Sequence, residues 1–498
     1  MKILGVDQMR ACDAFTIANE PIASIDLMER AALSCVKYLK THHSLTSTFV
    51  IICGPGNNGG DWLAIARLLS AEGAGVKVYA DLTERCSEDF KLNFERLPQA
   101  LIKSVSTFEV IETPKCIIID ALYGSGLSRK LQGRDLELVA KINASECQVI
   151  AIDVPSGLNA DGKVYPKEYE AVHADVTLSL ELPKLALLLP GFQVFSGDMK
   201  VIPIGLHQGF ISKQHSDYEY FTRRAAQVIY RPKAQFSHKG TNGHALIVAG
   251  SKGKMGAALM AGESCLRSGA GLLSMLVPQE GRALVQTRLP EAMLENNEGA
   301  ESLSGLYELN YSYVGVGPGI GLATPTRVFL KSLLSTYIPM VIDADALNII
   351  AEEKWQSLIP KNSILTPHPK EFSRLVGSWS TDLEKLEKLR SFAISHQIIV
   401  VLKGAYTAVA TPAGQISFNS TGNPGMATGG TGDILTGILT GLLAQGYAPV
   451  DAARFGVFLH GLAGDLAASA KSMEALIATD LIAQIGSAFR TVQQGEAV

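Results

Sequence analysis

Residues 423–433 read Asn-Pro-Gly-Met-Ala-Thr-Gly-Gly-Thr-Gly-Asp, and they decide how the second half of this 498-residue sequence is interpreted. Four of these eleven residues are glycine, and the apolar run Ile434–Leu439 begins where they stop. Glycines let successive backbone N–H groups face one concavity, and the start of the next helix adds its positive dipole end. We predict that Thr431 caps this helix and that Asp433 lies in its first turn. The loop therefore predicts a phosphate cradle with a general base beside it.

Two other interpretations of this loop can be weighed from the sequence. A glycine-rich helix start used only for close packing stays open, whereas a Walker-type P-loop is excluded because no Gly-Lys-Ser/Thr follows. The loop resembles the anion-hole and catalytic-base segment of ribokinase-like kinases. The longer string Asn423–Asp433 is similar to the NAD(P)H-hydrate dehydratase branch of that superfamily.

The bulk composition fits an α/β enzyme of two to four domains, with 47% apolar residues, 18% charged residues and 47 glycines. A net charge of −4 with scattered basic residues argues against a nucleic-acid partner. The seven cysteines contain no Cys-x-x-Cys pair, so we expect buried thiols in a reducing compartment. There is no signal peptide pattern and no run of 18 apolar residues, so we expect a cytoplasmic protein that does not span a membrane.

The first half predicts a doubly wound, Rossmann-like three-layer sandwich. The apolar runs Phe49–Cys53, Cys116–Ile119 and Val149–Ile152 are typical of strands buried on both faces, and each leads into a polar or glycine-rich loop. The loop at 54–61 is expected to precede a helix that begins at Trp62. Asp120, Asp153 and their neighbours should meet at the carboxyl edge of the sheet, where ligands bind. Oxygen ligands of low total charge suit a monovalent cation better than zinc, and Arg129 and Lys130 offer charge for a phosphate.

The motifs at 57–61, 124–127 and 153–157 resemble those of the NAD(P)H-hydrate epimerase domain, a likeness that covers most of residues 10–210. It implies that Asp153 acts at the hydrated nicotinamide carbon. It also implies a potassium ion held by Asn58, Asp120 and Ser156. The implied substrate-binding residues are Asn57, Asn58, Gly59, Gly60, Asp61, Gly124, Ser125, Gly126, Leu127, Ser128, Arg129, Lys130 and Asp153. A structural turn at 57–61, and aspartates that only cap helices, stay open as alternatives.

The second half restarts the α/β pattern, and its loops resemble those of the ribokinase-like dehydratase. The resemblance implies that the hydrated dinucleotide is held by Ala257, Gly319, His368 and Asp433. It implies nucleotide binding by Lys403, Gly404, Ala405, Tyr406, Thr407, Gly429, Gly430, Thr431 and Gly432. His368 has a structural alternative, and Asp343 and Asp345 could serve magnesium or cap a helix.

The resemblance covers nearly the whole chain and predicts an epimerase domain at 1–212, a connector at 213–222 and a dehydratase domain at 223–498. The expected activities are epimerisation of NADHX and NADPHX and their nucleotide-driven dehydration, with potassium and magnesium as cofactors. ADP is favoured over ATP as phosphoryl donor, and a homo-oligomer is expected. Two alternatives stay open: a vitamin or sugar kinase with an accessory domain, and a first half that is a non-catalytic binding module.

Overall fold

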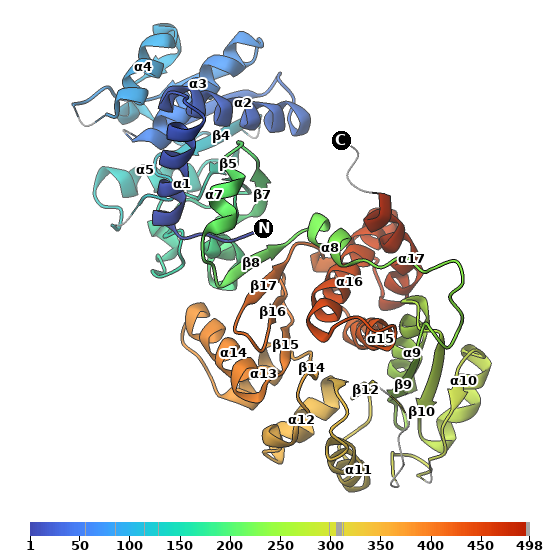
Figure 1. Ribbon diagram of the computed structural model, residues 1–498. Helices are drawn as coiled ribbons and strands as arrows, with labels where there is room; N and C mark the ends of the chain where they lie inside the picture. The colour runs from blue at the N-terminus through green and yellow to red at the C-terminus, as the bar shows by residue number, and fades with distance from the viewer. Residues whose placement is uncertain are drawn as a thin grey trace. The chain divides into compact units, whose positions relative to one another are not determined.

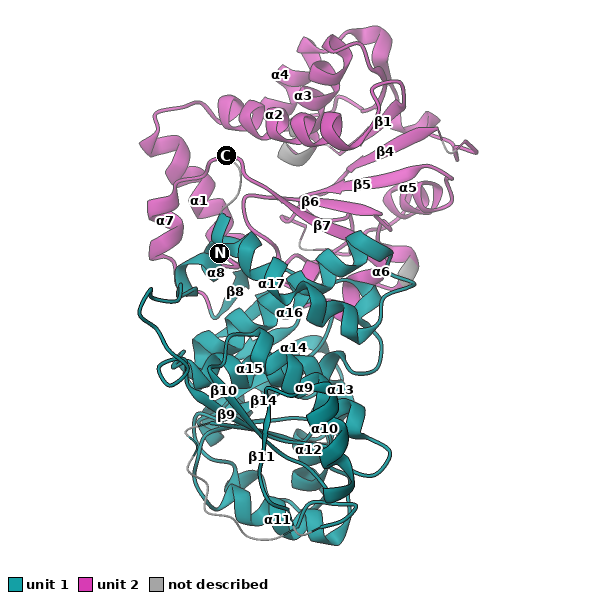
Figure 2. Ribbon diagram, turned by 90° about the vertical axis from the view of Figure 1, so that its right-hand side faces the viewer, with its two compact units in different colours: residues 1, 217–498 teal, residues 2–216 magenta. Residues whose placement is uncertain are grey.

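The computed structural model describes residues 1–494 except 55, 85, 114, 128, 298, 305–310 and 312, and leaves out the side chains of residues 57, 58, 61 and 168. The chain forms two compact units, Lys2–Ser216 and Asp217–Val498, and Met1 groups with the second (Figure 2). The division lies inside the predicted connector. We expected no element there, but strand β8 (Tyr218–Phe221) joins the sheet of the second unit.

The N-terminal unit contains a seven-stranded sheet flanked by helices (Figure 1). Its strands are β1 Thr48–Cys53, β2 Gly75–Tyr79, β3 Ile102–Lys103, β4 Cys116–Ala121, β5 Gln148–Ile152, β6 Val176–Leu180 and β7 Asp198–Ile202. Its α-helices are α1 Val6–Asn19, α2 Ser24–His42, α3 Asn57–Ala71, α4 Glu88–Arg96, α5 Arg134–Asn143, α6 Gln193–Ser196 and α7 Gln208–Lys213.

The predicted sandwich is confirmed, and strand β1 shows why. Phe49 and Ile51 pack in the core beneath α2 and α3, whereas Val50 and Ile52 pack in the core beneath α5. Successive side chains of a strand face opposite sides, so an unbroken apolar run requires helices on both faces. All neighbouring strands pair in parallel, in the order β3-β2-β1-β4-β5-β6-β7. The order reverses between β1 and β4, which creates the crevice in which such sheets bind ligands.

Two of the cysteines correct the expectation of seven buried thiols. Cys116 and Cys147 are joined in a disulfide, with Cα atoms 5.2 Å apart. Cys116 begins β4 and Cys147 directly precedes β5, so the parallel pairing of these strands places the two residues side by side. The other five are buried thiols, as predicted.

The C-terminal unit contains a ten-stranded sheet. Its strands are β8 Tyr218–Phe221, β9 His244–Val248, β10 Leu272–Leu276, β11 Met293–Leu294, β12 Val314–Val316, β13 Met340–Ile342, β14 Ile364–Leu365, β15 Ile399–Leu402, β16 Ala408–Ala410 and β17 Ile416–Asn419. Its α-helices are α8 Arg223–Ile229, α9 Met255–Arg267, α10 Arg282–Arg288, α11 Thr324–Leu334, α12 Ala344–Glu352, α13 Pro369–Val376, α14 Asp382–His396, α15 Thr431–Ala444, α16 Pro449–Lys471 and α17 Ala478–Gln494.

The sheet order is β11-β10-β9-β12-β13-β14-β15-β16-β17-β8, with β9 through β15 in parallel contact across the centre. Here the order reverses between β9 and β12. Helix α9 packs along α15 within the same unit, because Gly437 and Gly441 let the two helices approach closely. A Cβ at Gly437 would lie 2.1 Å from the carbonyl oxygen of Ala261. The small residues of α9 therefore have a partner inside the unit.

Within the described part of the chain, no helix combines the length and apolar character needed to cross a bilayer. The predicted homo-oligomer stays a prediction.

Candidate active sites

The first candidate site lies along the carboxyl edge of the C-terminal sheet. Five neighbouring parallel strands, β9, β12, β13, β14 and β15, each deliver a loop to this edge. At the switch point, Ala257 in α9 and Gly319 after β12 lie side by side, since a Cβ at Gly319 would be 3.1 Å from that of Ala257. Gly319 has φ +63°, a conformation that glycine adopts without strain. The structure thus brings together two residues predicted to hold the dinucleotide.

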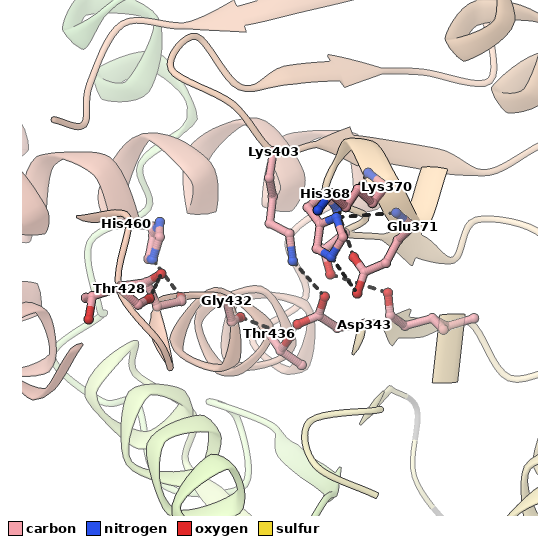
Figure 3. Close-up of polar contacts among 12 residues, drawn as sticks. Asp343, His368, Lys370, Glu371, Lys403, Thr428, Gly432, Thr436 and His460 are labelled. Carbon is pink, nitrogen blue, oxygen red and sulfur yellow. Dashed lines mark hydrogen bonds and ion pairs between the residues drawn. The ribbon is translucent and has the colours of Figure 1, made fainter. Parts of the chain in front are cut away.

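A buried ion pair occupies the centre of this edge. Asp343, at the end of β13, accepts hydrogen bonds from Lys403 Nζ and from Thr436 Oγ1, both at 3.0 Å (Figure 3). Asp343 occupies the N-cap position of α12 without capping it through its side chain. Asp345 accepts from Lys254 Nζ at 3.0 Å and from the Gly321 N–H at 2.9 Å. Neither aspartate caps α12 through its side chain, and the magnesium role stays a prediction.

The glycine-rich loop enters α15 differently from the prediction. Gly430, with φ +97°, occupies the N-cap position, and Thr431 is the first helical residue. The Thr431 hydroxyl donates to the carbonyl oxygens of Met426 and Thr428, both at 3.1 Å. The predicted Thr431 cap is wrong, because the left-handed turn at Gly430 sets the chain direction one residue earlier. Helix geometry leaves the first N–H groups of α15, including that of Gly432, without intrahelical acceptors.

The predicted base, Asp433, lies in the first turn of α15. Burial, followed by the charge of Asp343, raises the pKa of Asp433 to about 7. Lys403 acts in the opposite direction and lowers it. Burial alone would lower the pKa of Lys403, but Asp343, Glu371 and Asp433 outweigh it and the pKa is raised, so this lysine stays charged. A carboxylate with a pKa near neutrality is suited to accept a proton from a hydroxyl.

Lys403 also marks the predicted nucleotide loop at 403–407, which follows β15. The Gly404 N–H donates to Thr407 Oγ1 at 3.3 Å, and that hydroxyl donates back to the Gly404 carbonyl at 3.0 Å, closing a tight turn. The Lys403 ammonium lies at Gly432, where an added Cβ would be 3.3 Å from Nζ. The two segments predicted to bind nucleotide, 403–407 and 429–432, therefore meet at this point.

His368 is held firmly at the start of α13. Its Nδ1 accepts from the N–H groups of Lys370 at 3.1 Å and Glu371 at 3.3 Å, while Glu371 accepts from the His368 N–H at 2.8 Å. This capping box fixes the ring, and Nε2 lies 3.5 Å from Glu371 Oε1. The side chain is 45% exposed, so the capping role and the predicted substrate contact are compatible.

Sequence reasoning missed His460 in α16. Its Nε2 lies 2.9 Å from the carbonyl oxygen of Thr431, where the glycine-rich loop enters α15. Burial lowers the pKa of His460 to about 4, which keeps the ring neutral. The flanking apolar helix pattern offers no signal for this contact, because it joins residues 29 positions apart.

The second candidate site lies at the carboxyl edge of the N-terminal sheet. Asp120 in β4 is fully buried and accepts from the Ser156 hydroxyl at 2.6 Å and the Ser156 N–H at 2.7 Å. The carbonyl oxygen of Tyr123 is 3.1 Å from Ser156 Oγ. Burial raises the pKa of Asp120 to about 6. Within the described residues no cationic side chain pairs with this carboxylate, so the oxygen cluster suits a monovalent cation.

Asp153, directly after β5, forms a buried ion pair with Lys184, a residue that sequence reasoning missed. Lys184 also donates to the carbonyl oxygens of Leu180 at 2.8 Å and Leu182 at 3.1 Å. Burial alone would raise the pKa of Asp153, but the Lys184 ammonium outweighs it and the pKa is lowered. Asp153 has φ +63°, an uncommon conformation for a non-glycine residue, and such conformations often occur at functional sites.

The remaining residues predicted for this site lie at 57–61 and 124–130. The Ser125 N–H donates to Asp153 Oδ2 at 3.3 Å, which joins the loop at 124–130 to this aspartate. Lys130 pairs with Glu170 at 3.1 Å, and Arg129 is exposed. Helix α3 begins at Asn57 rather than Trp62, so residues 57–61 form its first turn and not a preceding loop. The prediction for Ser128 lies outside the described residues, as do the predictions for the side chains of Asn57, Asn58 and Asp61.

Comparison with known proteins adds an independent observation. The family described as NAD(P)H-hydrate dehydratase matches residues 245–486, and the family described as YjeF-related protein N-terminus matches residues 24–186. The bifunctional NAD(P)H-hydrate repair enzyme Nnr of Moorella thermoacetica is 33% identical over 521 residues, covering 99% of this chain and 98% of that protein. The chain belongs to the bifunctional NAD(P)H-hydrate repair enzyme family.

Two solved structures are similar to the C-terminal unit. A ribokinase-like superfamily protein of Enterococcus faecalis V583 is 26% identical, covers 56% of this chain and 98% of its own, and has a TM-score of 0.50. An ADP/ATP-dependent NAD(P)H-hydrate dehydratase from Bacillus subtilis, crystallised with ATP and Mg²⁺, is 30% identical, covers 55% and 98%, and has a TM-score of 0.49. The predicted ribokinase-like fold is confirmed, and membership of the repair-enzyme family favours hydrate repair over the kinase and binding-module alternatives.

Proposed function

We propose that this protein repairs hydrated nicotinamide cofactors, with one step in each unit. The N-terminal unit interconverts the two epimers of NADHX and NADPHX, and the C-terminal unit removes water from the (S) epimer in a nucleotide-driven reaction. The observation that supports the second step best is the position of Asp433. Its carboxylate has a pKa near 7 and lies in the first turn of a helix whose free N–H groups suit a phosphoryl group.

Water is lost slowly from the hydrated ring because hydroxide is a poor leaving group, and phosphorylation of the hydroxyl replaces it with a better one. Asp433 takes the proton of the substrate hydroxyl. The hydroxyl oxygen of the substrate attacks the terminal phosphorus of the nucleotide, and the bond between that phosphorus and the leaving nucleotide breaks. The amides near Gly432 and the Lys403 ammonium stabilise the charge of the transferring group. The ring nitrogen then expels phosphate as the C–O bond breaks, and loss of a ring proton restores the reduced nicotinamide. ADP is the donor we favour, and AMP and phosphate are then the products.

Of the two predicted metals, potassium is the one for which the chain offers a suitable set of oxygen ligands. Asp120 and Ser156 offer buried oxygens without a cationic partner in the described part of the chain, so they fit potassium. Potassium there would neutralise Asp120 and order the loops that hold the dinucleotide. Asp343 and Asp345 do not fit magnesium, because Lys403 and Lys254 already pair with them. We therefore propose that magnesium arrives with the nucleotide phosphates, its usual partners.

In the epimerase site, Asp153 is the group we assign to acid–base work at the hydrated carbon. Lys184 holds the carboxylate ionised and fixes its direction. The Ser125 N–H contributes a second contact to the same carboxylate. The site residues at 57–61 and 124–130, together with those at Ala257, Gly319 and His368 in the other unit, keep their predicted binding roles in this proposal.

The test separates the two activities on one purified protein. Both hydrate epimers are supplied with ADP or ATP, and return of the reduced nicotinamide is followed by absorbance while epimers are separated by chromatography. We expect Asp433→Ala to abolish dehydration and leave epimer interconversion intact, and replacement of potassium by lithium to slow interconversion alone. Normal dehydration by Asp433→Ala, or a stable phosphorylated product, would refute the dehydratase assignment.

A further inference from the structure

One side of helix α16 faces the glycine-rich segment 421–431. His460 and Gly464 are one helical turn apart, as are Gly461 and Asp465, so all four lie on one side of the helix. Each of them contacts the segment 421–431. None of these residues figured in the sequence-based site, and the proposed chemistry does not use their side chains directly.

His460 acts on the end of the loop that enters α15. The neutral ring donates through Nε2 to the Thr431 carbonyl at 2.9 Å (Figure 3). That carbonyl and the N–H of Gly432 belong to one planar peptide unit and point in opposite directions. Fixing the carbonyl therefore fixes the direction of the Gly432 N–H, one of the donors assigned to the transferring phosphoryl group.

Asp465 acts on the other end of the same loop. Its Oδ2 accepts from the Gly422 N–H at 3.0 Å, and its Oδ1 accepts from the Asn423 amide at 2.9 Å. The Asn423 side chain in turn accepts from the Gly425 N–H at 3.1 Å. Both carboxylate oxygens thus hold the start of the loop.

The two glycines between these side chains bring the helix and loop into direct contact. An added Cβ at Gly461 would lie 2.3 Å from Thr421 Oγ1, and one at Gly464 would lie 2.3 Å from Met426 Sδ. The helix therefore contacts the loop at both ends and along its middle.

We propose that His460 and Asp465 are positioning residues that hold the loop at 421–431 in the geometry required for phosphoryl transfer, with His460 aiming the Gly432 N–H. This proposal rests on the function proposed above. A glycine-rich helix start could adopt several backbone conformations. The contacts from His460 and Asp465 explain how its N–H groups stay aligned before the nucleotide binds.

The test compares H460L, H460Q, D465A and the control Ser469→Ala, which alters an exposed residue of the same helix. Leucine cannot donate, whereas glutamine can donate to the Thr431 carbonyl. We expect the dehydration kcat to fall about 10- to 100-fold in H460L, with the nucleotide KM changed less than about threefold, because the lost alignment matters in the transition state. H460Q should stay within about threefold of the parent enzyme.

A second readout does not depend on the reaction. Amide hydrogen exchange of peptides spanning 421–432, measured without nucleotide, should accelerate in H460L and D465A and stay unchanged in the Ser469→Ala control. Wild-type kcat in H460L, or equal losses in H460L and H460Q, would overturn the proposal for His460. If H460L does not fold, D465A supplies the test, and unchanged kcat and exchange in D465A overturn the proposal. Absence of dehydration in the unaltered protein would instead sink the proposed function, and the exchange result would still judge the positioning role.

Discussion

The pH dependence of dehydration tests the central role of Asp433. The pKa of this carboxyl lies at about 7, against an ordinary value of 3.8, because it is buried and faces Asp343. From pH 6 to pH 8 the ionised fraction rises from about one tenth to about nine tenths. If the ionised form is the base, kcat/KM for dehydration rises about tenfold over this range and then levels off. A carboxylate of ordinary pKa would give no change.

The same shift makes a prediction about stability. A raised pKa means that the neutral carboxyl suits the folded state, so the stability present below pH 3.8 is lost as pH rises through about 7. D433N removes this ionisation and should unfold at a higher temperature than the parent at pH 8, but not at pH 4. The pKa difference corresponds to at most about 4 kcal/mol.

The assay measures initial rates with saturating nucleotide between pH 5.5 and 8.5, with thermal unfolding recorded in the same buffers. Epimer interconversion on the same protein samples is the control for enzyme concentration. A flat profile between pH 6 and 8, together with equal unfolding temperatures for D433N and the parent at pH 8, would refute the assignment of Asp433 as a neutral-pH base.

Two further predictions concern buried contacts. Lys184→Met leaves Asp153 buried without its cation, so epimerisation, followed by chromatography, should slow strongly and the unfolding free energy of the N-terminal unit should fall by about 3–5 kcal/mol. The control Lys163→Met removes an exposed ion pair and should cost about 1 kcal/mol or less. Equal effects of the two substitutions would contradict the argument. Gly437→Ala places a Cβ 2.1 Å from a backbone oxygen and should destabilise the C-terminal unit by about 1–3 kcal/mol. The control Gly486→Ala, in a helix with open space around the glycine, should be neutral or stabilising by up to about 1 kcal/mol. Calorimetry measures the unfolding temperatures, and equal values for the two variants would oppose the packing argument.

Local patterns accounted for much of this protein. The run Phe49–Cys53 predicted a strand buried on both faces, and the glycines before Ile434 predicted the start of α15, since both signals depend only on neighbouring residues. Strand-end aspartates such as Asp120 and Asp153 were placed correctly at a sheet edge, because parallel strands share their carboxyl edge.

Other features depended on distant segments. The pairing of Asp343 with Lys403 joins residues 60 positions apart, and the start of α15 at Thr431 followed from the backbone turn at Gly430 rather than from a side-chain cap. The strand at 218–221 was missed because four residues at a sheet edge carry too short a pattern.

The sequence by itself determined the two α/β halves and predicted a phosphate-binding loop with a candidate base at Asp433, because hydrophobic periodicity and glycine spacing are local properties of the chain. Only the tertiary structure decided that Lys184 meets Asp153 and that His460 meets the Thr431 carbonyl. These contacts arise when separate strands and helices pack, and packing brings together side chains whose spacing along the chain carries no signal.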